Sequence, residues 1–163
     1  MTGLDRTLAV LAELIAFPTV SSQSNLALIG RVEELLAGAG FAVTRIAAAE
    51  DGKAGLLARF GTGEGGVLWS AHSDVVPVAG QDWTLPPFEV TRQGGRLHGR
   101  GTTDMKGFLA CVLAFAETLR ERPPARPMMI ALSWDEEVGV RGIREMIGAV
   151  IPVVGIGVAL SET

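Results

Sequence analysis

Three short polar clusters interrupt an otherwise apolar chain, and they carry residue types that bind metal ions and move protons. The clusters are residues 70–77 (SAHSDVVP), 99–107 (GRGTTDMKG) and 134–139 (WDEEVG). Each has an ordinary alternative: a hydrogen-bonded turn, an aspartate that caps a helix, and a solvated acidic loop. Because all three occur in one chain, each after a predicted strand, together they favour a metal-dependent site. Imidazole with several carboxylates suits zinc, or cobalt and manganese as substitutes.

The spacing within the clusters has a chemical logic of its own. In an extended strand His72 and Asp74 point to the same side. His72 can therefore bind a cation through one ring nitrogen while Asp74 fixes the proton on the other nitrogen. Glu136 and Glu137 are adjacent and point differently. One of them can bind metal while the other stays free as a base.

The elements that must position these clusters alternate along the chain. The apolar spacing predicts helices over residues 4–17, 25–39, 106–122 and 141–149. It predicts strands over 41–47, 55–60, 66–71, 88–92, 96–99, 128–134 and 153–161, with a tight hairpin at Gly94-Gly95. This order predicts an α/β domain with a three-layer, mixed and largely parallel sheet and helices on both faces. Ligands of such sheets bind at the carboxyl ends of the strands.

Size and charge narrow the partners. The 163 residues suffice for one domain with a real core. A net charge of −4 and the lack of basic runs argue against nucleic acid and leave a small molecule as the partner. The longest uncharged run, Met146 to Ser161, is interrupted by Pro152 and falls short of the roughly 20 residues of a membrane span, so it predicts a buried strand with its preceding loop. A start without a secretory signal and a single cysteine, Cys111, expected to pack in a buried helix, fit the cytoplasm.

Taken together, the clusters resemble the signature segments of the dinuclear zinc aminoacylase and carboxypeptidase family. They occur in the family's order, with 32 residues from His72 to Asp104 and 32 from Asp104 to Glu136. The resemblance extends from about Leu4 to Glu162 and implies a zinc-exopeptidase-like fold. It also implies that residues 1–163 are the N-terminal part of the metal-binding catalytic domain. The lid or dimerisation domain and the C-terminal catalytic part would be absent, and the full-length protein would be a homodimer.

The resemblance implies a role for each candidate ligand. Asp104 would bridge two divalent metal ions, with zinc as the first expectation. His72 and Glu162 would complete the protein ligands of one ion, and Glu137 would bind the other. The alternative for Glu162 is an ordinary charged residue near a frayed end.

Two further roles and one backbone feature follow from the same resemblance. Glu136 would be the general acid and base, and Asp74 would support catalysis from behind His72. The peptide bond between Asp104 and Met105 would be cis. The family's further histidine ligand lies far downstream, whereas the second histidine here, His98, comes too early in the chain. The 163-residue chain alone is therefore expected not to turn over substrate at a useful rate.

The implied activity is metal-assisted hydrolysis of the amide bond of an N-acyl amino acid or peptide. Residues 76–83 and 135–139 look most like the branch that deacetylates N-acetylornithine in arginine biosynthesis. Desuccinylation of succinyl-diaminopimelate and general aminoacylase or carboxypeptidase activity are the alternatives, and a non-catalytic metal-binding fragment is an alternative of another class. A serine hydrolase is disfavoured because His72 would not be a free base, and a phosphate loop because residues 99–107 lack its Gly-Lys-Ser/Thr ending.

Overall fold

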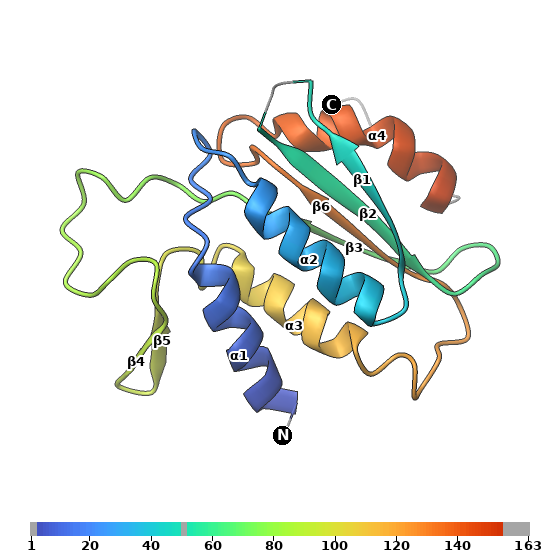
Figure 1. Cartoon of the computed structure of the whole chain (residues 1–163), viewed down its shortest axis with the longest axis horizontal. Helices are drawn as coiled ribbons and strands as arrows, with labels where there is room; N and C mark the ends of the chain where they lie inside the picture. Colours follow the sequence, from blue (N-terminus) through green and yellow to red (C-terminus); the bar gives the residue numbers. More distant parts are fainter. Residues whose placement is uncertain (1–2, 50–51, 155–163) are drawn as a thin grey trace, which may run out of the picture.

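The alternation expected from the sequence is present in a computed structural model, which describes residues 3–49 and 52–154 (Figure 1). The helices are α1 (Gly3–Ile15), α2 (Leu26–Gly38), α3 (Lys106–Ala116) and α4 (Arg141–Val154). The strands are β1 (Ala42–Ala47), β2 (Ala54–Phe60), β3 (Val67–His72), β4 (Thr91–Gln93), β5 (Arg96–His98) and β6 (Met128–Ser133).

Four of these strands form one mixed sheet in the order β1-β2-β6-β3. Strand β2 pairs antiparallel with both β1 and β6, and β3 pairs parallel with β6. The predicted mixed α/β sheet is confirmed, but the expectation of a largely parallel sheet is wrong for the described strands. The hairpin β4–β5 forms a separate two-stranded sheet, so it is not what makes the main sheet mixed. Its Gly94-Gly95 turn has positive φ at both residues, as two-residue hairpin loops favour.

Helices cover both faces of the main sheet, as expected (Figure 1). Helices α1, α2 and α3 lie on one face, and α4 lies on the other. On the α4 side, Met146 and Val150 pack against Met129 and Trp134. The larger core, on the opposite face, is made of buried aliphatic side chains that include Leu14, Ile29, Leu36, Leu109, Leu113 and Ile130.

The predicted helix over 141–149 is confirmed, whereas the predictions of a strand from Val153, of a helix that extends to Arg122 and of a buried Cys111 are wrong. The expected strand over 153–161 does not begin at Val153, because α4 continues through Pro152 to Val154; residues 155–161 lie outside the described residues. Met146, within the predicted helix 141–149, and Val150, one helical turn further on, form the buried stripe of this helix. Helix α3 ends at Ala116, short of the predicted 122, and Cys111 on it is exposed.

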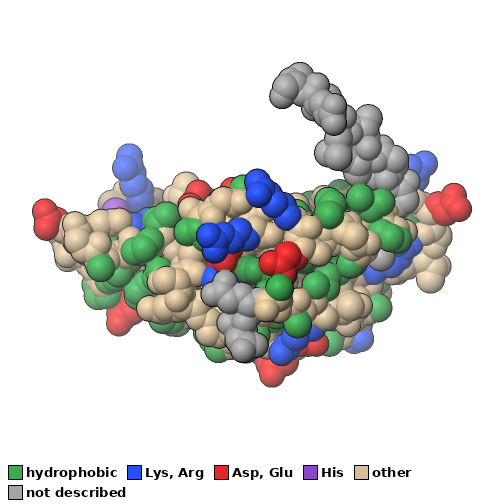
Figure 2. All heavy atoms as spheres, turned by 90° about the horizontal axis from the view of Figure 1, so that it is seen from above, with side chains coloured by type: hydrophobic (Ala, Val, Ile, Leu, Met, Phe, Trp, Pro, Cys, Tyr) green, Lys and Arg blue, Asp and Glu red, His purple; other side chains and the backbone are tan. Residues whose placement is uncertain are grey.

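On the face shown in Figure 2, basic, acidic and hydrophobic side chains are interspersed. Some charges pair across elements: Arg6 of α1 reaches Glu117 just after α3, and Arg45 of β1 reaches Glu33 of α2. Within the described ranges, no helix combines the length and apolarity that crossing a membrane requires.

Candidate metal centre

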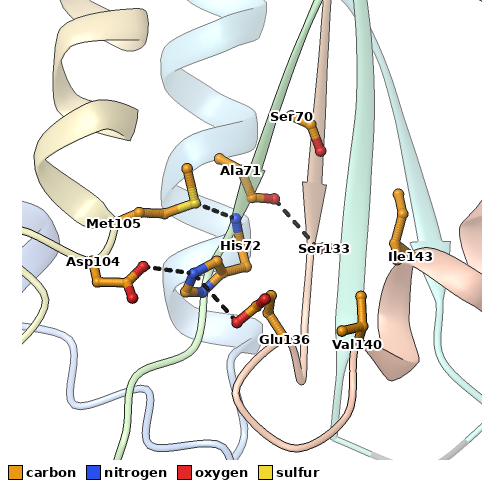
Figure 3. Close-up of a pocket in the computed structure, with 9 residues that line it drawn as sticks. All are labelled: Ser70, Ala71, His72, Asp104, Met105, Ser133, Glu136, Val140 and Ile143. Atoms are coloured by element: carbon orange, nitrogen blue, oxygen red, sulfur yellow. Dashed lines mark hydrogen bonds and ion pairs between the residues drawn. The ribbon is translucent and has the colours of Figure 1, made fainter.

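The ring of His72, the last residue of β3, lies between carboxylates from two other parts of the chain (Figure 3). Its Nε2 is 3.1 Å from Asp104 Oδ1 and 3.9 Å from Glu136 Oε2. The parallel pairing of β3 with β6 sets His72 opposite Ser133, so the residues that follow both strands emerge at one edge of the sheet. The expectation that His72 and Asp104 meet in one cleft is confirmed.

Asp104 reaches this edge on the glycine-rich loop that enters α3. The expectation that its cluster ends a strand of the core sheet is wrong, because the loop follows the separate hairpin. Asp104 does not cap α3 either, since the N-cap is Met105 and no side-chain cap hydrogen bond forms. The Asp104–Met105 peptide bond is cis, as expected. The loop packs tightly, because a Cβ on Gly107 would lie 2.3 Å from the carbonyl oxygen of Thr102.

Asp74 lies behind His72, as expected, but it holds the ring through a different atom. The Nδ1 of His72 is 3.0 Å from the backbone carbonyl oxygen of Asp74 and 3.5 Å from the carboxylate. A carbonyl oxygen can only accept, so Nδ1 carries a hydrogen and Nε2 is the atom that faces Asp104. Burial opposes protonation of the ring, but Asp74 and Asp104 outweigh it and raise the pKa of His72 to about 9.

The carboxylate of Asp74 fixes the loop that carries the two glutamates. It accepts the backbone N–H of Glu136 at 3.1 Å and that of Glu137 at 3.3 Å, and the hydroxyl of Ser21 at 2.7 Å. Burial raises the pKa of Asp74, but the contacts with His72, with Ser21 and with the two N–H groups prevail and lower it to about 2. Asp74 therefore stays charged and keeps its donors over the whole ordinary pH range.

Both glutamates gather at the histidine. One ligand atom from each of His72, Glu136 and Glu137 lies within 4.8 Å of the others. Burial and the charge of Asp104 raise the pKa of Glu137, while His72 acts in the opposite direction. The side chains of Glu136 and Asp104 are 43% and 69% exposed, so solvent reaches both carboxylates.

Two hollows meet at Asp104. One has a volume of about 290 Å³ and contains His72 and Glu136, with an apolar border that includes Val140 and Ile143 (Figure 3). The other, of about 240 Å³, is lined by residues 99–104 with Val76 and Glu137. Asp104 lines both hollows and therefore lies where the hollow with His72 and the hollow with Glu137 adjoin.

These residues fit a divalent ion. A histidine Nε2 with neighbouring carboxylates is a donor set that zinc accepts, and an Nδ1–H held by a carbonyl is the usual support of a zinc-binding histidine. The fourth expected ligand, Glu162, lies outside the described residues. His98 lies apart from this group, in β5, where it lines a separate hollow with Trp83.

Sequence reasoning missed a buried polar layer directly below the site. Ser21 and Asn25 precede α2, and Lys53 precedes β2; together with Ser73 and Asp135 they are at least nine-tenths buried. Asn25 Nδ2 donates to Ser73 Oγ at 2.9 Å, and Lys53 forms an ion pair with Asp135. Ser73 and Asp135 belong to the first and third polar clusters, but no motif marks Ser21, Asn25 or Lys53, whose one signal in the sequence is polarity beside apolar stretches.

Comparisons with known proteins agree with this architecture. The model of a family described as Peptidase family M20/M25/M40 matches residues 68–160. Acetylornithine deacetylase of Pasteurella multocida is 38% identical over 155 residues, which cover 90% of this chain and 40% of that protein. Acetylornithine deacetylase of Proteus mirabilis is 37% identical over 139 residues, which cover 81% of this chain and 36% of that protein. The chain thus spans about 40% of the length of these relatives.

Solved structures share the fold. Human carnosine dipeptidase 1 superposes with a TM-score of 0.77 at 24% identity, over 89% of this chain and 35% of that one. The M20 family metallo-carboxypeptidase Sso-CP2 from Sulfolobus solfataricus gives a TM-score of 0.76 at 23% identity, over 92% of this chain and 35% of that one. At these identities the likeness concerns the fold alone.

Proposed function

The chain belongs to peptidase family M20/M25/M40, and from that premise we propose that it is the metal-binding part of an amidohydrolase acting on N-acyl amino acids. Members of the family are metal-dependent and hydrolyse small acylated amino-acid or peptide substrates. One observation carries the proposal: the Nε2 of His72 faces Asp104 at 3.1 Å and gathers with Glu136 and Glu137.

The proposed ligands are His72, Asp104 and Glu137, with Asp104 shared between two ions. Zinc is the first candidate, with cobalt or manganese as substitutes. Glu162, beyond the described residues, would add a ligand on the His72 side. When bound, two such ions polarise the scissile carbonyl and lower the pKa of a water molecule.

Glu136 is the proposed proton carrier. Its Oε2 is 3.9 Å from His72 Nε2, too far for a hydrogen bond, and its side chain is 43% exposed in the hollow that it shares with Asp104. A carboxylate in this position can take the proton of the attacking water and deliver it to the departing amine. Val140 and Ile143 on the border of the same hollow offer an apolar surface to the acyl group.

N-acetylornithine is the substrate that we propose first, in arginine biosynthesis in the cytoplasm. The relatives from P. multocida and P. mirabilis, at 38% and 37% identity, both carry the name acetylornithine deacetylase. Succinyl-diaminopimelate desuccinylation and general aminoacylase or carboxypeptidase activity are the alternatives within the family. We further propose that residues 1–163 form the N-terminal part of the catalytic domain of a longer, dimeric protein. The 40% coverage of the relatives supports a longer protein, and a metal-binding fragment without turnover is the alternative of another class.

Zinc calorimetry on matched histidine variants tests the metal centre. We expect His72→Ala to lower the zinc affinity by more than the roughly 10–100-fold that loss of an outer-shell partner costs. His98→Ala is the control, because this second histidine lies outside the site, and it should leave the affinity unchanged. Equal zinc affinity in His72→Ala and the unaltered chain would overturn the proposal.

A hydrolysis assay separates the substrate candidates and the fragment hypothesis. The 163-residue chain and a longer chain with the relatives' full span are each given N-acetylornithine, N-succinyl-diaminopimelate and an N-acetylated apolar amino acid. We expect the longer chain to prefer N-acetylornithine and the 163-residue chain to show little turnover. If the longer chain prefers another substrate, that substrate replaces N-acetylornithine in the proposal. If both chains bind zinc and neither hydrolyses a substrate, the hypothesis of a metal-binding fragment without turnover is favoured.

A further inference from the structure

A buried ion pair lies beneath the candidate metal centre. Lys53 donates from Nζ to Asp135 Oδ1 and to the backbone carbonyl of Ser21. The two charged side chains are only 8% and 3% exposed. By contrast, both side chains of the cross-element pair Arg6–Glu117 are about one-third exposed. Burying a lysine is unfavourable unless its partners compensate for the lost water, so this arrangement needs both acceptors.

Both acceptors of Lys53 belong to segments that hold the site. Asp135 immediately precedes Glu136 and Glu137 and has a positive φ of 54°, so the chain turns sharply at this residue. Ser21 donates its hydroxyl to Asp74 Oδ2 at 2.7 Å, and Asp74 in turn accepts the N–H groups of the same two glutamates. The loop 135–137 is thus held by Asp74 on one side and by Lys53 on the other.

The charge of Lys53 matters as well as its position. Asp74 and Asp135 are two buried carboxylates beneath a cleft that also holds Asp104, Glu136 and Glu137. A buried cation bonded to Asp135 offsets part of this excess negative charge, and it does so in an environment that strengthens electrostatic interactions. A neutral donor at residue 53 could keep the hydrogen bonds to Asp135 and Ser21, but it would not offset the negative charge.

Resting on the proposed function, we propose that Lys53 is a positioning residue of the metal centre. Through Asp135 and Ser21 it fixes the loop 135–137 so that the carboxylates of Glu136 and Glu137 meet His72. It touches neither substrate nor metal ion. A purely structural lysine would instead stabilise the start of β2 without affecting the metal centre.

Four variants separate positioning from folding. Lys53→Met leaves the buried carboxylate of Asp135 without its ion-pair partner. This single variant can therefore lose zinc binding simply because it unfolds. The double variant Lys53→Met/Asp135→Asn removes both charges, and asparagine tolerates the positive φ at residue 135. Lys53→Arg retains the cation. Arg6→Met is the matched control, because it removes the ion pair with Glu117, away from the site.

The readouts are zinc affinity by calorimetry and hydrogen exchange of the Glu136 and Glu137 amides, at a temperature where circular dichroism shows each variant folded. We expect the double variant to lose about 10–100-fold in zinc affinity and to exchange both amides at least about tenfold faster. Lys53→Arg should recover most of the affinity. Arg6→Met should stay within about twofold of the unaltered chain, as a distant site does.

A folded double variant with unaltered zinc affinity and amide exchange would overturn the proposal. A double variant that does not fold would assign Lys53 to the fold and would overturn it equally. If the unaltered chain binds no zinc, the proposed function fails instead. The amide exchange then still decides whether Lys53 fixes the loop.

Discussion

The Oδ1 of Asp74 accepts the backbone N–H of Glu136 at 3.1 Å, although 62 residues of sequence separate the two. The other carboxylate oxygen accepts the N–H of Glu137. Asp74 thereby joins the histidine side of the centre to the glutamate side, since its own carbonyl holds the ring of His72. One residue can thus set the position of three candidate site residues.

Asp74→Asn tests this junction. An asparagine keeps one acceptor oxygen and replaces the other with an NH₂ group, so it can no longer accept from both Glu136 N–H, which donates to Oδ1, and Glu137 N–H, which donates to Oδ2. We expect a loss of about 1–3 kcal/mol in the free energy of unfolding and faster exchange of the Glu136 and Glu137 amides. Urea denaturation and hydrogen exchange measure the two effects.

Ser21→Ala is the graded control for Asp74→Asn. It removes one donor to Asp74 and leaves both N–H bonds in place. We therefore expect the free energy of unfolding to fall by about 0.5–1.5 kcal/mol and the exchange of the Glu136 and Glu137 amides to change little. If Asp74→Asn and Ser21→Ala behaved alike, the N–H bonds to Asp74 would not be what holds the loop.

The proposed division of labour between the two glutamates gives a second prediction. Glu137→Gln should weaken zinc binding, because an amide is a poorer ligand than a carboxylate. Glu136→Gln should leave the zinc affinity nearly unchanged and lower kcat of a full-span enzyme by about 10²–10⁴-fold, the usual contribution of a general base. Calorimetry and a hydrolysis assay on the same preparations measure both. If Glu136→Gln weakened zinc binding and Glu137→Gln lowered only kcat, Glu136 would be the metal ligand and Glu137 the general base.

The sequence predicts the gathering of the site well, because the signals are local and the parallel pairing is simple. His72 ends β3, and Glu136 follows β6 by three residues. Once β3 and β6 lie side by side and parallel, their carboxyl ends must meet. That Asp104 follows a separate hairpin could not be predicted in this way. Nothing in residues 99–107 indicates which sheet the preceding strand joins.

Other features depend on contacts that no local pattern encodes. A lysine before a strand is ordinarily solvated, so the burial of Lys53 follows only from where Asp135 and Ser21 come to lie. The sheet is less parallel than predicted because β2 runs against both of its neighbours. A strand from Val153 was predicted where α4 continues to Val154, because a short apolar run fits either a buried strand or a buried helix face.

The packing of the Asp104 loop gives a third prediction. A Cβ at Gly107 would lie 2.3 Å from the carbonyl oxygen of Thr102, and a backbone atom can move little to relieve this contact. We expect Gly107→Ala to lower the free energy of unfolding by about 1–3 kcal/mol and to weaken zinc binding through displacement of Asp104. Gly148→Ala in α4 is the control: nothing lies within 4 Å of its added Cβ, so it should be neutral or stabilise by up to about 1 kcal/mol. Thermal unfolding compares the two, and equal stabilities would show that the loop yields freely.

The fourth prediction concerns pH and the ion pair between α1 and the residue that follows α3. Arg6 Nε donates to Glu117 Oε2 at 2.9 Å, and this hydrogen bond lowers the pKa of Glu117 against the opposing effect of burial. A carboxyl group whose pKa is lower in the folded chain stabilises the fold above its unfolded pKa, and that contribution is lost as the pH falls through the folded pKa. Because both side chains are about one-third exposed, we expect Glu117→Gln to cost only about 0.2–1 kcal/mol at pH 7.

The difference between Glu117→Gln and the unaltered chain should shrink as the pH falls below the usual range of a glutamate, since the protonated carboxyl no longer attracts Arg6. Urea midpoints measured in steps from pH 7 down to about pH 3 follow this loss, which sets in as the pH falls through the lowered pKa of Glu117. Glu121→Gln is the control, an exposed glutamate four residues further along the same segment. It removes the same charge without removing this ion pair, so its effect should be near zero at each pH value. A Glu117→Gln effect that stayed constant from pH 7 to pH 3 would mean that side-chain packing, rather than charge, joins α1 to the segment after α3.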